Sequence, residues 1–169
     1  MSARRLILNV GDWYLGREYD FIETLLGSCV AVTFWHPQAR LGGMCHYLLP
    51  RRPKEHSGQL ADTRYGDETL QLMLKRIKAL GFHWPDFEIG LYGGGRIFPA
   101  EPATESIGRQ NTQFALDYFK QLKLGIARKD INGKGYRYIR LNVYKGTIDM
   151  LRDKKLLGSS HAAAKESEQ

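Results

Sequence analysis

The sequence is poor in cysteine and contains no long hydrophobic run. Its 169 residues include only Cys29 and Cys45, too few for a disulfide scaffold, and an intracellular chain would keep both thiols reduced. No apolar stretch approaches the roughly 20 residues that a membrane-spanning helix needs. The N-terminal residues lack the apolar segment and cleavage site of a secretory signal peptide. These absences favour a cytoplasmic protein without membrane insertion.

Recognisable motifs for binding metals or nucleotides are also missing. No Cys-x-x-Cys pair or spaced histidine pair accompanies the cysteines, so a zinc site has little support. Its ligands would be Cys29, Cys45, His36 and His46. The glycines at 93–95 are not followed by the Lys-Ser/Thr pair of a phosphate loop, which favours a tight turn instead. We expect no metal and no organic cofactor.

Positive charge is in excess, with a formal net charge of +7. The basic residues form short runs interrupted by acids, at 4–5, 51–54, 128–129 and 152–155. This dispersal is typical of a solvated surface, although attraction to an acidic protein surface is an alternative. No helix-turn-helix, zinc-finger or aromatic RNA-binding motif accompanies the charge, so we do not expect a nucleic-acid partner.

Strand-like segments make up most of the chain. They are short, rich in β-branched and aromatic residues, and bounded by Gly, Pro or Asp. The predicted strands cover 6–10, 30–35, 42–49, 87–92, 136–143 and 147–151. Since only a short turn separates 30–35 from 42–49, these two are expected to form a hairpin.

Two segments have the apolar spacing of amphipathic helices. One is predicted from an Asp67 cap to Leu80, closed by Gly81, and the other from an Asn111 cap to just before Gly125. The combination predicts a single-domain α/β layered sandwich over residues 1–151, with two or three helices on a mixed sheet. Residues 152–169 are rich in Lys, Ser, Ala and Glu and are expected to be a disordered C-terminal tail.

The segment around Cys29 and a histidine on the next predicted strand could form a catalytic pair. In the predicted hairpin, His46 lies opposite about residue 31 and therefore near Cys29, where an imidazole could accept the thiol proton. Gly27 permits a sharp turn, and the amides near Ser28 and Cys29 could stabilise an oxyanion.

Structural interpretations of the same residues remain open. A cysteine beside a strand is often a small core residue, and a neighbouring histidine is often only a satisfied interior side chain. Cys45 is a competing nucleophile, but adjacent strand residues face opposite sides, so His46 could not easily serve it. Ser28 could be a local turn residue, and Arg109 and Asn111 could simply begin a helix.

The order of several motifs resembles the CheD family. The resemblance extends from about residue 6 to 150 and rests on 26–32, 42–44, His46, 49–50, 64–65, 93–95, 107–109, Asn111, 130–135, Arg137 and Gly146. It implies an α/β sandwich similar to that of toxin-type cysteine deamidases. It also implies hydrolysis of glutamine side-chain amides in methyl-accepting chemotaxis receptors, giving glutamate and ammonia through a cysteine thioester.

The resemblance also assigns roles to individual residues. It makes Cys29 the nucleophile, His46 its base and Thr24 the residue that orients the imidazole. Gly27, Ser28, Arg109 and Asn111 are then expected to contribute to oxyanion stabilisation or substrate positioning. The implied partners are chemoreceptors and, in some bacteria, the phosphatase CheC. A mainly non-catalytic adaptor that binds a receptor or CheC is the alternative function.

Overall fold

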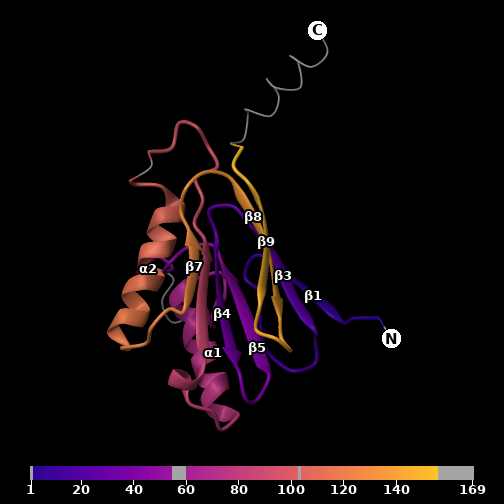
Figure 1. The fold of residues 1–169 in the computed structure, drawn as a ribbon. Coiled ribbons are helices and arrows are strands. Elements are labelled where there is room, and N and C mark those ends of the chain that lie inside the picture. Colours follow the sequence, from indigo (N-terminus) through magenta and orange to yellow (C-terminus); the bar gives the residue numbers. More distant parts are fainter. Residues whose placement is uncertain (1, 55–59, 103, 156–169) are drawn as a thin grey trace.

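The protein is a three-layer sandwich of helices and two β-sheets (Figure 1). The computed structural model describes residues 2–54, 60–102 and 104–155. In chain order, the elements are β1 (Arg5–Leu8), β2 (Trp13–Gly16), β3 (Phe21–Leu26), β4 (Val30–His36), β5 (Leu41–Tyr47), α1 (Gly66–Ala79), the short 3-10 helix η2 (Trp84–Asp86), β6 (Glu88–Gly93), α2 (Ile107–Gln121), β7 (Arg128–Ile131), β8 (Tyr136–Asn142) and β9 (Ile148–Asp153).

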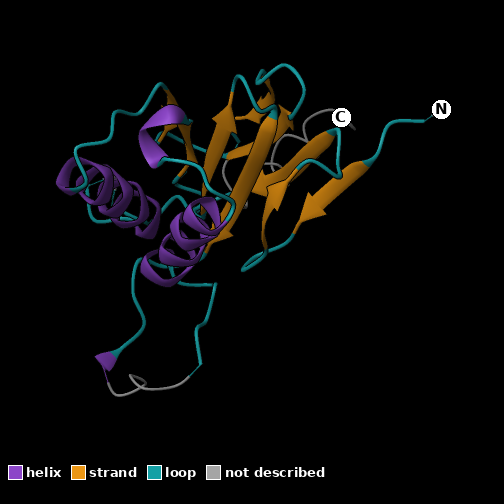
Figure 2. Ribbon diagram, turned by 90° about the horizontal axis from the view of Figure 1, so that it is seen from below, coloured by secondary structure: helices purple, strands orange, loops and turns teal. Residues whose placement is uncertain are grey.

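The strands divide between a five-stranded and a four-stranded sheet. The first has the order β2-β5-β4-β6-β7 and the second β1-β3-β8-β9. Each contains one parallel pair, β6 with β7 and β1 with β3, and is otherwise antiparallel. Both α-helices lie on one face of the five-stranded sheet, and the four-stranded sheet covers its other face (Figure 2). The predicted α/β layered sandwich is confirmed, but its division into two sheets was not predicted.

The five-stranded sheet separates two hydrophobic cores. Along β4, Val30, Val32 and Phe34 face the helices, whereas Ala31 packs against the four-stranded sheet. This alternation follows from the two-residue repeat of a strand that is buried on both faces. β4 is therefore a central strand that contributes to both cores.

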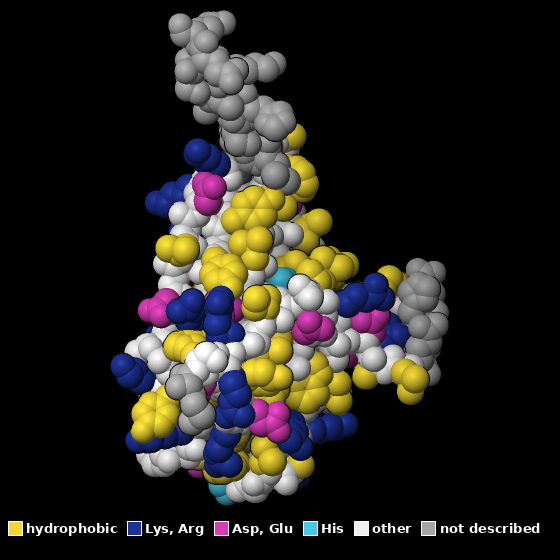
Figure 3. Space-filling model, turned by 90° about the vertical axis from the view of Figure 1, so that its right-hand side faces the viewer, with side chains coloured by type: hydrophobic (Ala, Val, Ile, Leu, Met, Phe, Trp, Pro, Cys, Tyr) yellow, Lys and Arg dark blue, Asp and Glu magenta, His cyan; other side chains and the backbone are white. Residues whose placement is uncertain are grey.

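The outer face of the four-stranded sheet carries exposed apolar side chains. Ile7, Leu25 and Leu151 are more than half exposed there, and Figure 3 shows hydrophobic side chains gathered along this side among lysines and arginines. Glu23 on the same face accepts hydrogen bonds from Arg5, Arg140 and Tyr138. These bonds, above all that from Arg5, lower the pKa of Glu23 to about 2.

Each of the six predicted strands corresponds to an observed strand, with shifts at the ends. Three short strands, β2, β3 and β7, were not predicted. β3 has the sequence Phe-Ile-Glu-Thr-Leu-Leu, in which Glu23 and Thr24 are both buried, so its polarity does not alternate as in a sheet with one solvent-exposed face. β7 is a short, largely polar strand at the edge of its sheet.

Both helices begin earlier than predicted. α1 begins at Gly66, so Asp67 lies in its first turn instead of capping it, while Gly81 has the left-handed conformation expected after its end. α2 begins at Ile107, and its cap is Ser106, whose hydroxyl accepts a bond from the amide of Arg109. The predicted cap at Asn111 is therefore wrong.

Two C-terminal boundaries also differ from the prediction. α2 ends at Gln121, earlier than the predicted end just before Gly125, and Lys123, with φ of 57°, adopts the left-handed conformation after it. β9 continues to Asp153, so the predicted tail boundary after residue 151 falls inside a strand. Residues 156–169 of that predicted tail lie outside the described residues. Within the described part, no helix is both long and apolar enough to cross a membrane.

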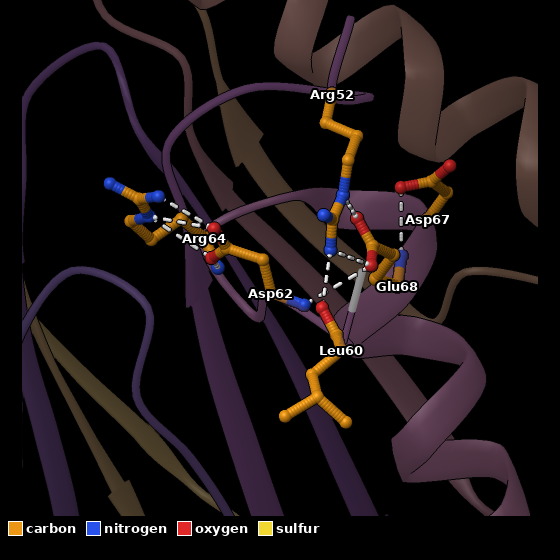
Figure 4. A network of polar contacts seen from close by, with 6 residues as sticks. All are labelled: Arg52, Leu60, Asp62, Arg64, Asp67 and Glu68. Atoms are coloured by element: carbon orange, nitrogen blue, oxygen red, sulfur yellow. Dashed lines mark hydrogen bonds and ion pairs between the residues drawn. The ribbon is translucent and has the colours of Figure 1, made fainter. Parts of the chain in front are cut away.

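A polar network fixes the loop that leads into α1 (Figure 4). Arg52 donates two bonds to the carboxylate of Glu68, at 2.6 and 2.8 Å, and a third to the carbonyl of Leu60. Arg64 pairs with Asp62, whose own amide donates to Glu68. The network holds the start of α1 near the end of β5, with Gly66 donating to the carbonyl of residue 49.

Candidate functional site

Cys29 lies in the turn between β3 and β4, on the inter-sheet side of the five-stranded sheet. Its side chain is 9% exposed and packs in the inter-sheet core. In the β4-β5 ladder His46 pairs with Ala31, as the hairpin prediction required. Cys29 precedes Ala31 by two residues and packs with it in the inter-sheet core, so it lies on the face of the sheet that His46 shares.

The imidazole of His46 is held by a residue of the opposite sheet. Thr24 on β3 brings its hydroxyl oxygen to 2.6 Å from Nδ1 of His46. The same hydroxyl donates its single proton to the carbonyl of Leu8, at 2.8 Å. A hydroxyl has only one proton, so Thr24 must accept the bond from His46 and Nδ1 must carry the hydrogen.

This tautomer leaves the other ring nitrogen of His46 available as a base. Nε2 is buried and has no hydrogen-bond partner in the described part of the chain. The backbone of His46 is fixed, because its amide donates to Asp12 and its carbonyl accepts from Gly11. A buried nitrogen with a free lone pair, held in one orientation, is suited to accept a proton from a thiol.

Burial makes both partners neutral in the resting protein. It raises the pKa of Cys29 to about 11 and lowers the pKa of His46 to about 4, although the charge of Asp12 opposes the second shift. At neutral pH the pair is therefore a thiol and an uncharged imidazole. The thiol proton would then move to His46 as the sulfur attacks, which is general-base catalysis.

The other cysteine is on the opposite face of the sheet. Cys45 is fully buried in the core beneath the helices, where burial raises its pKa to about 12. His36, the remaining zinc ligand considered, packs against the rings of Phe82 and Phe87 and accepts a bond from Ala39. The four candidate zinc ligands are thus not brought together, and Cys45 does not share a face with His46.

The glycine turn after β6 packs directly against the segment carrying Cys29. The amide of Gly94 donates to the carbonyl of Cys29 at 2.8 Å, and that of Gly95 donates to the carbonyl of Gly27 at 2.9 Å. Gly93 has φ of 107°, and a Cβ there would collide with the carbonyl oxygen of Cys29. The predicted tight turn is confirmed, and it supports the Cys29 backbone.

Asn111 joins the two strands that carry the candidate pair. Its side chain is completely buried, and Nδ2 donates to the carbonyl of Ser28 at 3.0 Å and to that of Leu48 at 2.9 Å. These residues precede Cys29 and follow the end of β5, respectively. Asn111 therefore holds the backbone next to Cys29, a role the sequence did not indicate. Arg109 is exposed and lines a cavity beside α2.

Arg137 is a further supporting residue that the sequence analysis did not assign. It is fully buried at the start of β8 and donates to Asp130 at 2.6 Å, to the carbonyl of Gly93 at 3.3 Å and to that of Asn132. It thus fixes the glycine turn that supports Cys29. The sequence could have indicated that Arg137 is buried, because it alternates in step with Ile139 and Leu141, which face the core.

Comparison with known proteins gives concordant matches. The family described as CheD chemotactic sensory transduction matches residues 48–152. A protein of Pseudomonas fluorescens named probable chemoreceptor glutamine deamidase CheD is 40% identical over 151 residues, covering 88% of this chain and 84% of the relative. A Chromobacterium violaceum protein with that name and the number 1 is 38% identical, covering 87% and 77%. One from Pseudomonas syringae pv. tomato, also so named, is 37% identical, covering 88% and 89%.

Proposed function

Because this chain belongs to the CheD family, we propose that it is a chemoreceptor glutamine deamidase with Cys29 as nucleophile, His46 as general base and Thr24 as the residue that orients His46. The observation that carries the proposal is the Thr24–His46 contact of 2.6 Å, which leaves Nε2 free on the face that Cys29 shares. The proposed substrates are methyl-accepting chemotaxis receptors, and the proposed compartment is the cytoplasm.

The reaction has two stages. Nε2 of His46 takes the proton of the Cys29 thiol while the sulfur attacks the carboxamide carbon of a receptor glutamine. The tetrahedral intermediate collapses to a thioester as the C–N bond breaks, and His46 returns the proton to the departing ammonia. His46 then removes a proton from water, which attacks the thioester and leaves glutamate and a regenerated thiol.

The turn at 27–29 is suited to stabilise the oxyanion. The carbonyls of Gly27 and Ser28 point toward Gly95 and Asn111, which donate to them. In a trans peptide the following N–H points the opposite way, so the amides of Ser28 and Cys29 are directed away from these donors. Amides held in this manner are available to a developing negative charge without reorganisation.

Ammonia release tests the proposal against the adaptor alternative. A purified receptor cytoplasmic fragment would be incubated with wild-type protein and with Cys29→Ala, and binding of both to the fragment and to CheC would be measured in parallel. The deamidase predicts ammonia from the wild type only, with binding retained by the variant. Binding by both proteins, without ammonia from several receptors, would instead support an adaptor.

A further inference from the structure

A cationic pocket lies beside the segment that carries Cys29. It is a cavity of about 210 Å³ lined by Arg96, Arg109 and Lys134, together with Gly94, Ser106 and Asn132. Gly94 connects it to the candidate site, because its amide donates to the carbonyl of Cys29 at 2.8 Å. The pocket is therefore one hydrogen bond from the backbone of the proposed nucleophile.

Two of the cations are held next to each other by the backbone. Arg96 and Lys134 are paired in an isolated parallel bridge, and the amide of Arg96 donates to Gly133 while its carbonyl accepts from Gly135. Side chains that leave a paired backbone side by side repel each other when they carry like charges. The fold thus maintains an electrostatically unfavourable pair at this position.

None of these three cations forms an ion pair with a carboxylate of the described residues. Seven arginines form ion pairs in that part of the chain, at positions 5, 52, 64, 128, 137, 140 and 152. Arg96, Arg109 and Lys134 form none there, and Arg96 donates only to the backbone carbonyl of Glu101, at 3.3 Å. These three cations are available to an external anion.

The nearby start of α2 is already occupied and does not supply the binding site. The carboxylate of Glu101 accepts from the amide of Ile107 at 2.9 Å, and the hydroxyl of Ser106 accepts from that of Arg109. An anion in the pocket would therefore be bound by the groups that line it, among which these three side chains carry the positive charge. Two guanidinium groups and an ammonium group suit a carboxylate, which arginine can bind through two parallel hydrogen bonds.

We propose that this pocket binds a carboxylate side chain of the substrate polypeptide, so that the enzyme prefers glutamines with a nearby aspartate or glutamate. The inference rests on the proposed deamidase function, in which the substrate is itself a protein segment passing over Cys29. The pocket would fix that segment, lowering KM for acidic substrates without taking part in the chemistry.

The test compares two receptor fragments that differ only in replacement of the acidic residues near the target glutamine by alanine. Wild-type kcat/KM for ammonia release should favour the acidic fragment by about tenfold or more, and added salt should reduce the preference. Arg109→Glu and Lys134→Glu should each abolish it through KM. Lys120→Glu, an equal charge change on the exposed surface near the other end of α2, should preserve it.

The outcomes separate this inference from the proposed function. If the wild type deamidates both fragments equally and both pocket variants behave like Lys120→Glu, the pocket proposal is wrong and the deamidase stands. If no fragment releases ammonia, the deamidase proposal fails. Fluorescence anisotropy with Cys29→Ala and both fragments then tests the pocket by itself: tighter binding of the acidic fragment, lost in the Lys134→Glu double variant, supports it, and equal binding overturns it.

Discussion

The two faces of the five-stranded sheet are both buried but have different chemistry. Beneath the helices the core has many aromatic rings and encloses Cys45, and its buried polar side chains include His36 and Thr69. Between the sheets lie Cys29, His46 and Thr24, with an imidazole nitrogen that has no partner in the described part of the chain. Burying a polar group without a partner costs free energy, so the unpartnered Nε2 of His46 fits a role in chemistry better than a role in stability.

Replacing each cysteine by alanine in turn should distinguish the roles of the two faces most clearly. Cys29→Ala should reduce ammonia release by more than about a thousandfold, because the nucleophile is lost, with little change in stability. Cys45→Ala should retain activity within a few-fold but lower the free energy of unfolding by about 1–2 kcal/mol through a small cavity. Ammonia assays and urea unfolding of both variants measure the two effects. Loss of activity in Cys45→Ala with activity retained in Cys29→Ala would contradict the assignment of the nucleophile.

Acid should destabilise the inter-sheet face through His46. Its folded-state pKa of about 4 lies below the ordinary value of 6.5, so between these values the unfolded chain binds a proton that the folded protein excludes. Titration of His46 therefore does not change the free energy of unfolding above about pH 6.5. As the pH drops towards 4, it lowers that free energy by up to about 3 kcal/mol, or over a hundredfold in the folding equilibrium.

The control for this pH dependence is a neutral side chain at the same position. Urea unfolding from pH 7 to 4 should show a smaller loss for His46→Gln than for the wild type, whereas His83→Gln at an exposed site should follow the wild type. Parallel pH profiles for all three proteins would contradict a buried, neutral His46.

Removing the Asn111 donors should loosen the connection between the two strands of the site. Asn111→Asp keeps the shape but places a carboxylate against the carbonyls of Ser28 and Leu48, so unfolding should become easier by about 2 kcal/mol or more. Gln110→Glu, one residue away on the exposed side of α2, should change stability by less than about 0.5 kcal/mol. Thermal unfolding of the two variants provides the comparison; equal values would show that the buried amide does not hold the strands.

Removing the Thr24 hydroxyl, which orients His46, should have the smallest of the four predicted effects. Thr24→Val preserves size but removes the acceptor of the Nδ1 hydrogen, so the other tautomer becomes accessible and kcat should fall by at least about tenfold with KM unchanged. Thr24→Ser should restore activity. Thr33→Val is the control: it removes a buried hydroxyl of β4, in the other sheet, and should leave kcat within about twofold of the wild type. Steady-state kinetics with equal losses for both valine variants would argue against orientation by Thr24.

The sequence predicted the parts of this site that depend on local pattern. The β-branched run before a short turn predicted the hairpin, and with it the position of His46 opposite residue 31. Thr24 could be assigned only through the family resemblance, because β3 is short, carries buried polar residues and pairs with distant strands. The pairing of Arg96 with Lys134 and the hydrogen bonds of Asn111 to Ser28 and Leu48 depend on packing between segments far apart in the sequence. The hydrophobic periodicity of a segment does not predict such packing.

The most direct test of the central claim is mass spectrometry of a receptor cytoplasmic fragment after incubation with the wild type and with Cys29→Ala. Deamidation through Cys29 predicts a gain of about one dalton at each modified glutamine, located by peptide sequencing, with the wild type and none with the variant. The same gain with Cys29→Ala, or no gain with any receptor fragment that the wild-type protein binds, would contradict the account.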